Sequence, residues 1–229
     1  MPFDLDTFLF GYYPYIALTV LFLGSLIRFE REQYTWKAGS SQLLSRKQLM
    51  LGSYLFHIGI LVIFLGHFAG LLTPIWVFDA MGVSHEAKQT LAIVAGGVAG
   101  VMCFFGLLLL IQRRLFDARV RVTSSFSDVF ILILLFFQVT LGLLTIPQSM
   151  NHLDGGEMIK FMNWAQHIFT FREGAVEFVR DVSPIFKAHL VLGCTILLVF
   201  PFTRLVHVLS APIWYVFRKG YQVVRTKKS

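Results

Sequence analysis

Long runs of residues without charge dominate the pattern of polar and apolar positions along the chain. A spanning helix needs about 20 mostly apolar residues, and four runs bounded by charged residues meet that length. They are residues 7–27, 48–78, 89–112 and 129–153. A fifth run, 188–203, is long enough only if its helix continues through Arg204, whose long side chain can reach the membrane interface. The pattern predicts five transmembrane helices.

The predicted fold is an all-α membrane protein, a bundle of five transmembrane helices that forms one domain over residues 1–229. No small-residue cleavage site follows the first run, so we interpret that run as a retained helix and not a signal peptide. The loop from 147 to 184 is long and contains a semi-apolar stretch that suits a short interfacial helix. The five helices are expected at about 7–28, 50–76, 88–112, 126–147 and 184–209.

Basic residues indicate how the bundle is oriented in the membrane. Of the 20 lysine and arginine residues, few fall on the side of the second and fourth loops: Lys88, Lys160, Arg172, Arg180 and Lys187. Because cytoplasmic loops carry the excess of basic residues, the N-terminus is expected outside and the C-terminus in the cytoplasm. The same rule explains the net charge of +7 without nucleic acid, whose binding would need a basic groove on a soluble fold.

Composition agrees with a lipid environment. The chain is 56% hydrophobic, 15% aromatic and only 14% charged, and its mean hydropathy is +0.68. These values are too apolar for a soluble domain of this size, so the lipid bilayer is the expected solvent. Cys103 and Cys194 both lie inside apolar runs, and we expect neither a disulfide nor a cysteine metal motif.

Four of the seven histidines fall in two of the predicted helices. His57 and His67 lie in the second, and His189 and His207 lie in the fifth. A lone histidine in a soluble core is more often a hydrogen-bonded core residue, but ionisable groups within a membrane are rare and usually functional. At 1.5 Å per residue, the first two are about 15 Å apart and the last two about 27 Å apart. Two separate depths exclude a single transition-metal site shared by all four.

The direction of the helices pairs these histidines. Since the second and fifth helices cross the membrane in opposite directions, His57 shares a depth with His207, and His67 shares a depth with His189. A low-spin haem takes two axial imidazoles, and one from each of two helices at the same depth is sufficient to hold it. Straight helices would place the two irons roughly 20 Å apart. The histidines therefore predict two b-type haems and a role in electron transfer.

Other residues near the histidines extend the predicted site. Glycines remove side-chain bulk where a macrocycle must approach the backbone, although plain helix packing explains each of them equally well. Arg113, Arg114 and Arg204 stand at the cytoplasmic edge near the inner pair and are candidates for contacts with haem propionates, with surface snorkelling as the alternative. The glycines in question are Gly59, Gly66, Gly70 and Gly193.

Several longer stretches carry a family resemblance. They include FHIGILVIFLGHFAGLLTPIW (56–76), HLVLG (189–193) and FPFTRLVH (200–207), together with YPYIA, QYTWKAGSSQLL, RRLF and GLLTIP. Over nearly its whole length, the chain resembles the gamma subunit, the cytochrome b, of membrane-bound respiratory nitrate reductase. The outer loop, 148–183, matches least well, which leaves any quinone specificity set there undefined.

The resemblance implies a ligand set and partners. His67 and His189 would ligate the distal haem b near the outer face, and His57 and His207 the proximal haem b near the cytoplasm. Electrons would pass from there to an iron–sulfur beta subunit and then to a molybdenum-containing alpha subunit that reduces nitrate. The expected location is the bacterial cytoplasmic (inner) membrane. The chain has no cysteine-rich motif of its own for such clusters.

The resemblance also implies a quinol site beside the distal haem. Members of this family oxidise menaquinol or ubiquinol there, and a lysine at the start of the third helix assists, which would be Lys88. Gly66, next to the distal ligand His67, would line the same pocket. On the residues alone, Lys88 is explained equally well as an interfacial anchor.

Two other functions remain open from the sequence. A related dihaem cytochrome b that feeds another quinone-linked cytoplasmic complex, such as a sulfur-metabolising one, would share the haems and differ in its partner. A proton-coupled transporter that uses the histidines as a relay would be colourless and would be expected to contain an internal repeat. No such repeat is visible.

Overall fold

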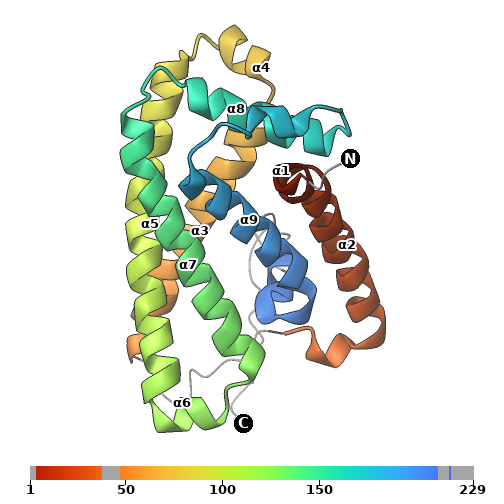
Figure 1. Cartoon of the computed structure of the whole chain (residues 1–229). Coiled ribbons are helices and arrows are strands. Elements are labelled where there is room, and N and C mark those ends of the chain that lie inside the picture. The colour runs from red at the N-terminus through yellow and green to blue at the C-terminus, as the bar shows by residue number, and fades with distance from the viewer. Residues whose placement is uncertain (1–3, 38–46, 211–216, 218–229) are drawn as a thin grey trace.

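The computed structural model describes residues 4–37, 47–210 and 217. Within these residues all regular structure is helical, and five segments are long and apolar enough to cross a membrane, which confirms the predicted number of spans. The long helices run side by side as a bundle (Figure 1). The five segments are Leu5–Arg31, Gln48–Leu72, His85–Phe116, Phe126–Met150 and Pro184–Phe202.

The first span changes helical type near its start. It consists of α1 (Leu5–Thr7), the π-helical turn η1 (Phe8–Tyr12) and α2 (Tyr13–Arg31), followed by the 3₁₀ turn η2 (Gln33–Thr35). Pro14 stands at the beginning of α2 and has no N–H group to donate. The wide turn therefore lies where the regular hydrogen-bond ladder is already interrupted.

The second span ends earlier than predicted. Its helix, α3 (Lys47–Leu72), stops before residue 76, and a separate short helix, α4 (Ile75–Ala80), begins after Pro74. A residue that precedes proline is pushed out of the helical region, which accounts for the break. The amide Nε2 of Gln166 donates to the carbonyl oxygens of Leu71 (3.2 Å) and Thr73 (3.1 Å), so the broken end is capped from another helix.

The third and fourth spans extend beyond the predicted ranges. α5 (His85–Phe116) begins at Ser84, whose hydroxyl accepts from the Ala87 N–H. α6 (Ala118–Val122) is a short turn that leads to α7 (Phe126–Met150). α7 begins with a capping box in which Ser125 and Asp128 each accept from the other's backbone N–H. This arrangement fixes the position of Asp128 at the start of α7.

The long loop that follows α7 contains the helix that the sequence predicts. α8 (Gly156–Phe169) lies across one end of the bundle, opposite the end that holds α6 (Figure 1). The 3₁₀ turn η3 (Ala175–Phe178) follows it. The indole Nε1 of Trp164 donates to the Phe10 carbonyl oxygen at 3.0 Å and ties α8 to the first span.

The fifth span departs most from prediction. The helix expected over 184–209 is α-helical only in α9 (Pro184–Val199), and the chain continues through the 3₁₀ turns η4 (Phe200–Phe202) and η5 (Arg204–Ser210). Pro201 explains the break, because proline removes a helical donor and clashes with the preceding turn. The separation of the two haem irons that assumed straight helices therefore does not apply to this segment.

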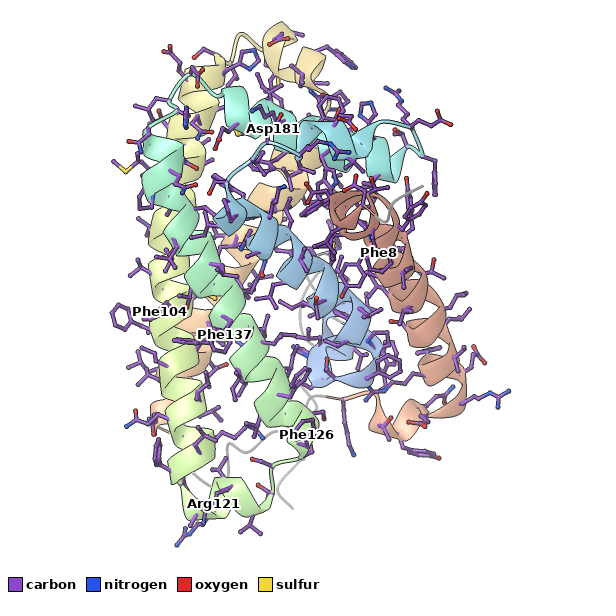
Figure 2. All side chains as sticks on the ribbon, in the orientation of Figure 1. Phe8, Phe104, Arg121, Phe126, Phe137 and Asp181 are labelled. Carbon is purple, nitrogen blue, oxygen red and sulfur yellow. The ribbon has the colours of Figure 1, made fainter. Side chains whose placement is uncertain are left out.

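Close packing joins neighbouring spans in the order α3, α5, α7, α9 and α2. One buried cluster, around Leu107 and Ile131, lies between α3, α5 and α7, and a second, around Phe10 and Phe186, joins the first span to α8 and α9. Arg121 and Asp181 lie at opposite ends of the bundle (Figure 2).

Which end of the bundle faces the cytoplasm stays a prediction. It is based on the distribution of basic residues, and several of these, namely Arg46 and those from Arg218 onward, lie outside the described residues. Cys103 and Cys194 are buried free thiols, as expected.

Candidate functional site

The four intramembrane histidines form two facing pairs. The ring centres of His57 and His207 are 6.4 Å apart, and those of His67 and His189 are 6.3 Å apart. The first ring of each pair comes from α3, and its partner comes from η5 or α9. The structure therefore brings together the same couples that the antiparallel helices predict.

These separations suit a metal ion between two imidazoles. An iron about 2.0 Å from each ligating nitrogen, with each nitrogen about 1.1 Å from its ring centre, separates two opposed ring centres by about 6.2 Å. In the part of the chain that the structure describes, the backbones of α3 and α9 do not pack closely along their lengths. The imidazoles thus face each other between helices that are otherwise held apart, and the residues fit two bis-histidine haems.

Three of the four imidazoles are oriented by the chain itself. Nδ1 donates to a carbonyl oxygen one turn earlier in each case: His57 to Ser53 (2.7 Å), His67 to Ile63 (2.9 Å) and His207 to Arg204 (2.5 Å). A carbonyl oxygen can only accept, so the proton lies on Nδ1 and the lone pair on Nε2. This is the arrangement that metal-ligating histidines usually adopt.

His189 has different surroundings. Its Nδ1 is buried without a hydrogen-bond partner among the described residues, and its Nε2 lies 3.5 Å from the amide Nε2 of Gln138. The same amide donates to the His189 carbonyl oxygen at 3.2 Å, while Gln138 Oε1 is buried and unsatisfied. A Cβ at Gly142 would lie 3.0 Å from Cε1 of the His189 ring. An orphaned buried nitrogen on the ring that faces His67 fits a ligand role.

The four glycines predicted near the haems divide into two groups. A Cβ on Gly66 or Gly70 would meet nothing within 4 Å, which agrees with space for a bulky group beside α3. A Cβ on Gly193 would lie 3.3 Å from the Gln138 amide. Gly59 differs, because its Cβ would lie 2.6 Å from the Ala99 carbonyl oxygen. At Gly59 the correct interpretation is close packing of α3 on α5, not approach of a macrocycle.

Lys88 is buried beside the C-terminal end of α3. Its side chain is only 8% exposed, so it does not reach out as an interfacial anchor. Nζ lies 3.3 Å from the Gly70 carbonyl oxygen, 2.8 Å from Met162 Sδ and 3.6 Å from the ring centre of Phe78. Among the described residues, no carboxylate lies within ion-pair distance of this ammonium group. Gly70 follows His67 by about one helical turn, so the cation is near the pair formed by His67 and His189.

The three arginines predicted to contact propionates lie at the other end of the bundle. Arg114 Nη1 is 3.2 Å from Asp128 Oδ2, and Arg204 Nε is 3.6 Å from Asp128 Oδ1. Arg113 is buried, with 3% exposure. Arg114 and Arg204 therefore have a partner within the protein, and contact of any of the three with a propionate stays a prediction.

Several residues of this region were not identified from the sequence. Gln138 and Gly142 contact His189 from α7, and Phe78 and Met162 surround the Lys88 ammonium group. A glutamine inside an apolar span was a visible signal for the first. The others depend on which helices approach each other, which no local pattern reveals.

Sequence similarity to known proteins identifies the family of this chain. The profile of the nitrate reductase gamma subunit family matches residues 6–227. The chain belongs to this family. The respiratory nitrate reductase 1 gamma chain of Escherichia coli (strain K12) is 52% identical over 97% of this chain and 98% of its own length. The nitrate reductase gamma chain of Bacillus subtilis (strain 168) is 39% identical over 96% of this chain and 97% of its own length.

Membership of the gamma subunit family agrees with the five spans and identifies a multi-pass protein of the inner membrane. The chain is the membrane subunit of a respiratory nitrate reductase, an electron-transferring oxidoreductase of several subunits. The Hdr-like menaquinol oxidoreductase cytochrome b-like subunit of Archaeoglobus fulgidus is 31% identical over 69% of this chain and 47% of its own length.

Proposed function

We propose that this gamma subunit is the dihaem, quinol-oxidising subunit of its complex. His67 and His189 hold the distal haem b, and His57 and His207 hold the proximal haem b. The observation that carries the proposal is the presence of two imidazole couples with ring centres 6.3 and 6.4 Å apart, each built from two different helical segments.

When bound, the two haems supply one-electron chemistry, which lets a two-electron donor deliver its electrons singly toward the cytoplasmic side. The chain supplies binding and orientation. The carbonyl oxygens of Ser53, Ile63 and Arg204 each hold one imidazole by its Nδ1 proton and leave Nε2 directed away from its own helix.

The quinol site lies at the outer pair. His67 lies on α3, and the Lys88 ammonium group approaches the same helix at Gly70, one turn later. Gly66, next to His67, leaves open space there. The Lys88 ammonium, whose printed contacts are a carbonyl, a sulfur and an aromatic ring, is available to donate a hydrogen bond to a quinol oxygen. Oxidation of quinol to quinone releases two protons and two electrons, and the protons leave toward the outer face.

The partners lie at the cytoplasmic end. An iron–sulfur beta subunit receives the electrons, and a molybdenum-containing alpha subunit reduces nitrate to nitrite and water with two electrons and two protons. The N-terminus is outside and the C-terminus is in the cytoplasm, so electrons move inward while protons are released outside. This separation displaces charge across the membrane.

The test is haem content of the purified subunit. A reduced-minus-oxidised spectrum with pyridine haemochrome quantification should give two b haems per wild-type chain. The His67→Ala variant should lose the distal haem and quinol oxidation and keep the proximal haem. His152→Ala, which removes an exposed histidine outside both pairs, is the matched control and should keep both. Retention of both haems by His67→Ala would refute the ligand assignment.

A second candidate differs in the partner. The Archaeoglobus relative is a subunit of a menaquinol oxidoreductase, so a dihaem subunit of another quinone-linked complex is the alternative, a sulfur-metabolising complex being one example. Co-purification of a molybdenum-containing subunit supports the nitrate reductase assignment, and co-purification of a different redox enzyme supports the alternative. A colourless protein would contradict both and favour a transporter.

A further inference from the structure

The segment that carries His207 is the least regular part of the candidate site. It begins after the break at Pro201 and runs as the 3₁₀ turn η5, so an α-helical ladder does not fix its direction. Short 3₁₀ turns have poorer hydrogen-bond geometry than α-helices. Some other contact must therefore set where the His207 ring points.

One such contact comes from the end of α2. Arg28 Nη1 donates to the carbonyl oxygens of Pro201 (2.6 Å) and Thr203 (2.9 Å), one on each side of the junction between η4 and η5. Its Nη2 donates to the Thr35 carbonyl oxygen at 2.9 Å, so the guanidinium group itself is held in place. The planar, many-donor group of arginine suits this role better than the single ammonium of lysine.

A second contact comes from the start of α7. Asp128 lies 3.6 Å from Arg204 Nε and 3.2 Å from Arg114 Nη1, so one carboxylate joins η5 to α5. The backbone carbonyl oxygen of Arg204 accepts the Nδ1 proton of His207. Through Arg204, the Asp128 carboxylate therefore acts on the residue whose backbone orients the imidazole. At the far end of η5, Trp36 Nε1 donates to Ser210 Oγ.

We propose that Arg28 and Asp128 are positioning residues for His207, acting from opposite sides on the segment 201–207, and that they set the ligation of the proximal haem without affecting the distal one. The proposal rests on the proposed function, since it takes His207 to be an axial ligand. Neither residue contacts the His207 ring directly; each acts through the backbone or through Arg204.

The variants Arg28→Gln and Asp128→Asn remove one contact each. Both should weaken retention of the proximal haem by up to about 10-fold, the lower end of the loss that follows removal of a direct outer partner of a metal ligand, because each acts on His207 through other groups. Retention is measured by transfer of haem from the purified subunit to an excess of a haem-scavenging apoprotein. The reduction potential and the electron paramagnetic resonance signal of the proximal haem should shift, whereas those of the distal haem should not.

Matched controls separate positioning from general stability. Arg31→Gln changes the same charge at an exposed position on the same helix. Asp117→Asn makes the same change as Asp128→Asn at the carboxylate that accepts from the Arg119 and Val120 N–H groups at the start of α6. Both controls should leave the proximal haem unchanged. Arg28→Lys and Asp128→Glu, which preserve charge, should recover part of the loss.

Three outcomes overturn the proposal: unchanged proximal signals, equal changes in both haems, or equal effects of the controls. Hydrogen–deuterium exchange of residues 204–210 gives an independent reading, since Arg28→Gln and Asp128→Asn should raise exchange there and the controls should not. If the wild-type chain carried no haem, the proposed function would fail, and the exchange measurement would still decide whether Arg28 and Asp128 hold the segment.

Discussion

The His67–His189 pair and the His57–His207 pair have nearly equal ring separations but are built differently. His67 and His189 both lie in regular α-helices, and residues of a third helix, α7, pack against the His189 ring. His57 also lies in a regular helix, whereas its partner His207 follows a proline break and depends on polar contacts. The comparison teaches that the same couple can be fixed by packing at one depth and by charged side chains at another.

The largest effect on haem content is expected from a bulkier side chain beside the His67–His189 pair. Gly142→Leu places a side chain where a Cβ alone would lie 3.0 Å from the His189 ring. The ring must move, so the distal haem should be lost and the content should fall from two haems to one, with the proximal haem retained. Pyridine haemochrome assays measure this. Gly96→Leu, at a position where a Cβ meets nothing within 4 Å, is the control, and equal loss there would contradict the packing argument.

The next prediction separates quinol oxidation from haem ligation at the His67–His189 pair. Lys88→Gln removes the buried cation near His67 and keeps a side chain of similar length. Quinol oxidation should fall by about 100-fold, the lower range for loss of a positioned acid or base, while both haems remain. Steady-state quinol assays and spectra of one preparation decide it. Lys160→Gln, an exposed change on α8, should retain activity, and full activity in Lys88→Gln would remove this residue from the proposed site.

A smaller effect, on protein stability, is expected in α3, which carries one histidine of each pair. Gly59 lies between His57 and His67 on α3, and an added Cβ would lie 2.6 Å from the Ala99 carbonyl oxygen of α5. Gly59→Ala should lower the free energy of unfolding by about 1–3 kcal/mol, the usual range for overpacking. Gly66→Ala, in open space, should change it by less than about 0.5 kcal/mol. Equal thermal shifts in the two variants would argue against rigid α3–α5 packing.

The smallest effect concerns the pH dependence of stability and involves Asp4, just before α1. The Thr7 hydroxyl, which donates to Asp4 at 2.6 Å, and the Arg180 guanidinium hold the pKa of Asp4 below its usual value. A carboxyl with a depressed pKa contributes stability above its unfolded value of about 4 and loses that contribution as the pH falls through the folded value. Thermal scans of Asp4→Asn should show a slightly flatter acid dependence than wild type. Because these groups are exposed, a large change would be unexpected.

The pairing of the histidines could be predicted from the sequence because it depends on two simple quantities, the rise of a helix and its direction across the membrane. Helix rise and antiparallel direction put His57 near the depth of His207 and His67 near the depth of His189, and the packing of the helices then brings each couple face to face. The early ends of α3 and α9 have a signal in the sequence, since Pro74 and Pro201 stand close after them, but the apolar runs continue past both prolines and predict longer helices.

Other parts of the site depend on contacts between distant segments. In the sequence, Arg28 is one of several basic residues beside an apolar run, and its contacts with the Pro201 and Thr203 carbonyl oxygens join residues 173 and 175 positions apart. Asp128 became informative only when Arg114 and Arg204 were seen to share it. Propensity and periodicity describe one helix at a time, and these roles arise where helices meet.

A final consequence follows from the unbroken course of α3. Both of its imidazoles stand on one rigid rod, so their mutual register is set only by the count of residues between positions 57 and 67. Inserting or deleting one amino acid there would rotate one ring by roughly 100° relative to the other. The segment from His57 to His67 should therefore accept changes of side chain more readily than any change of length.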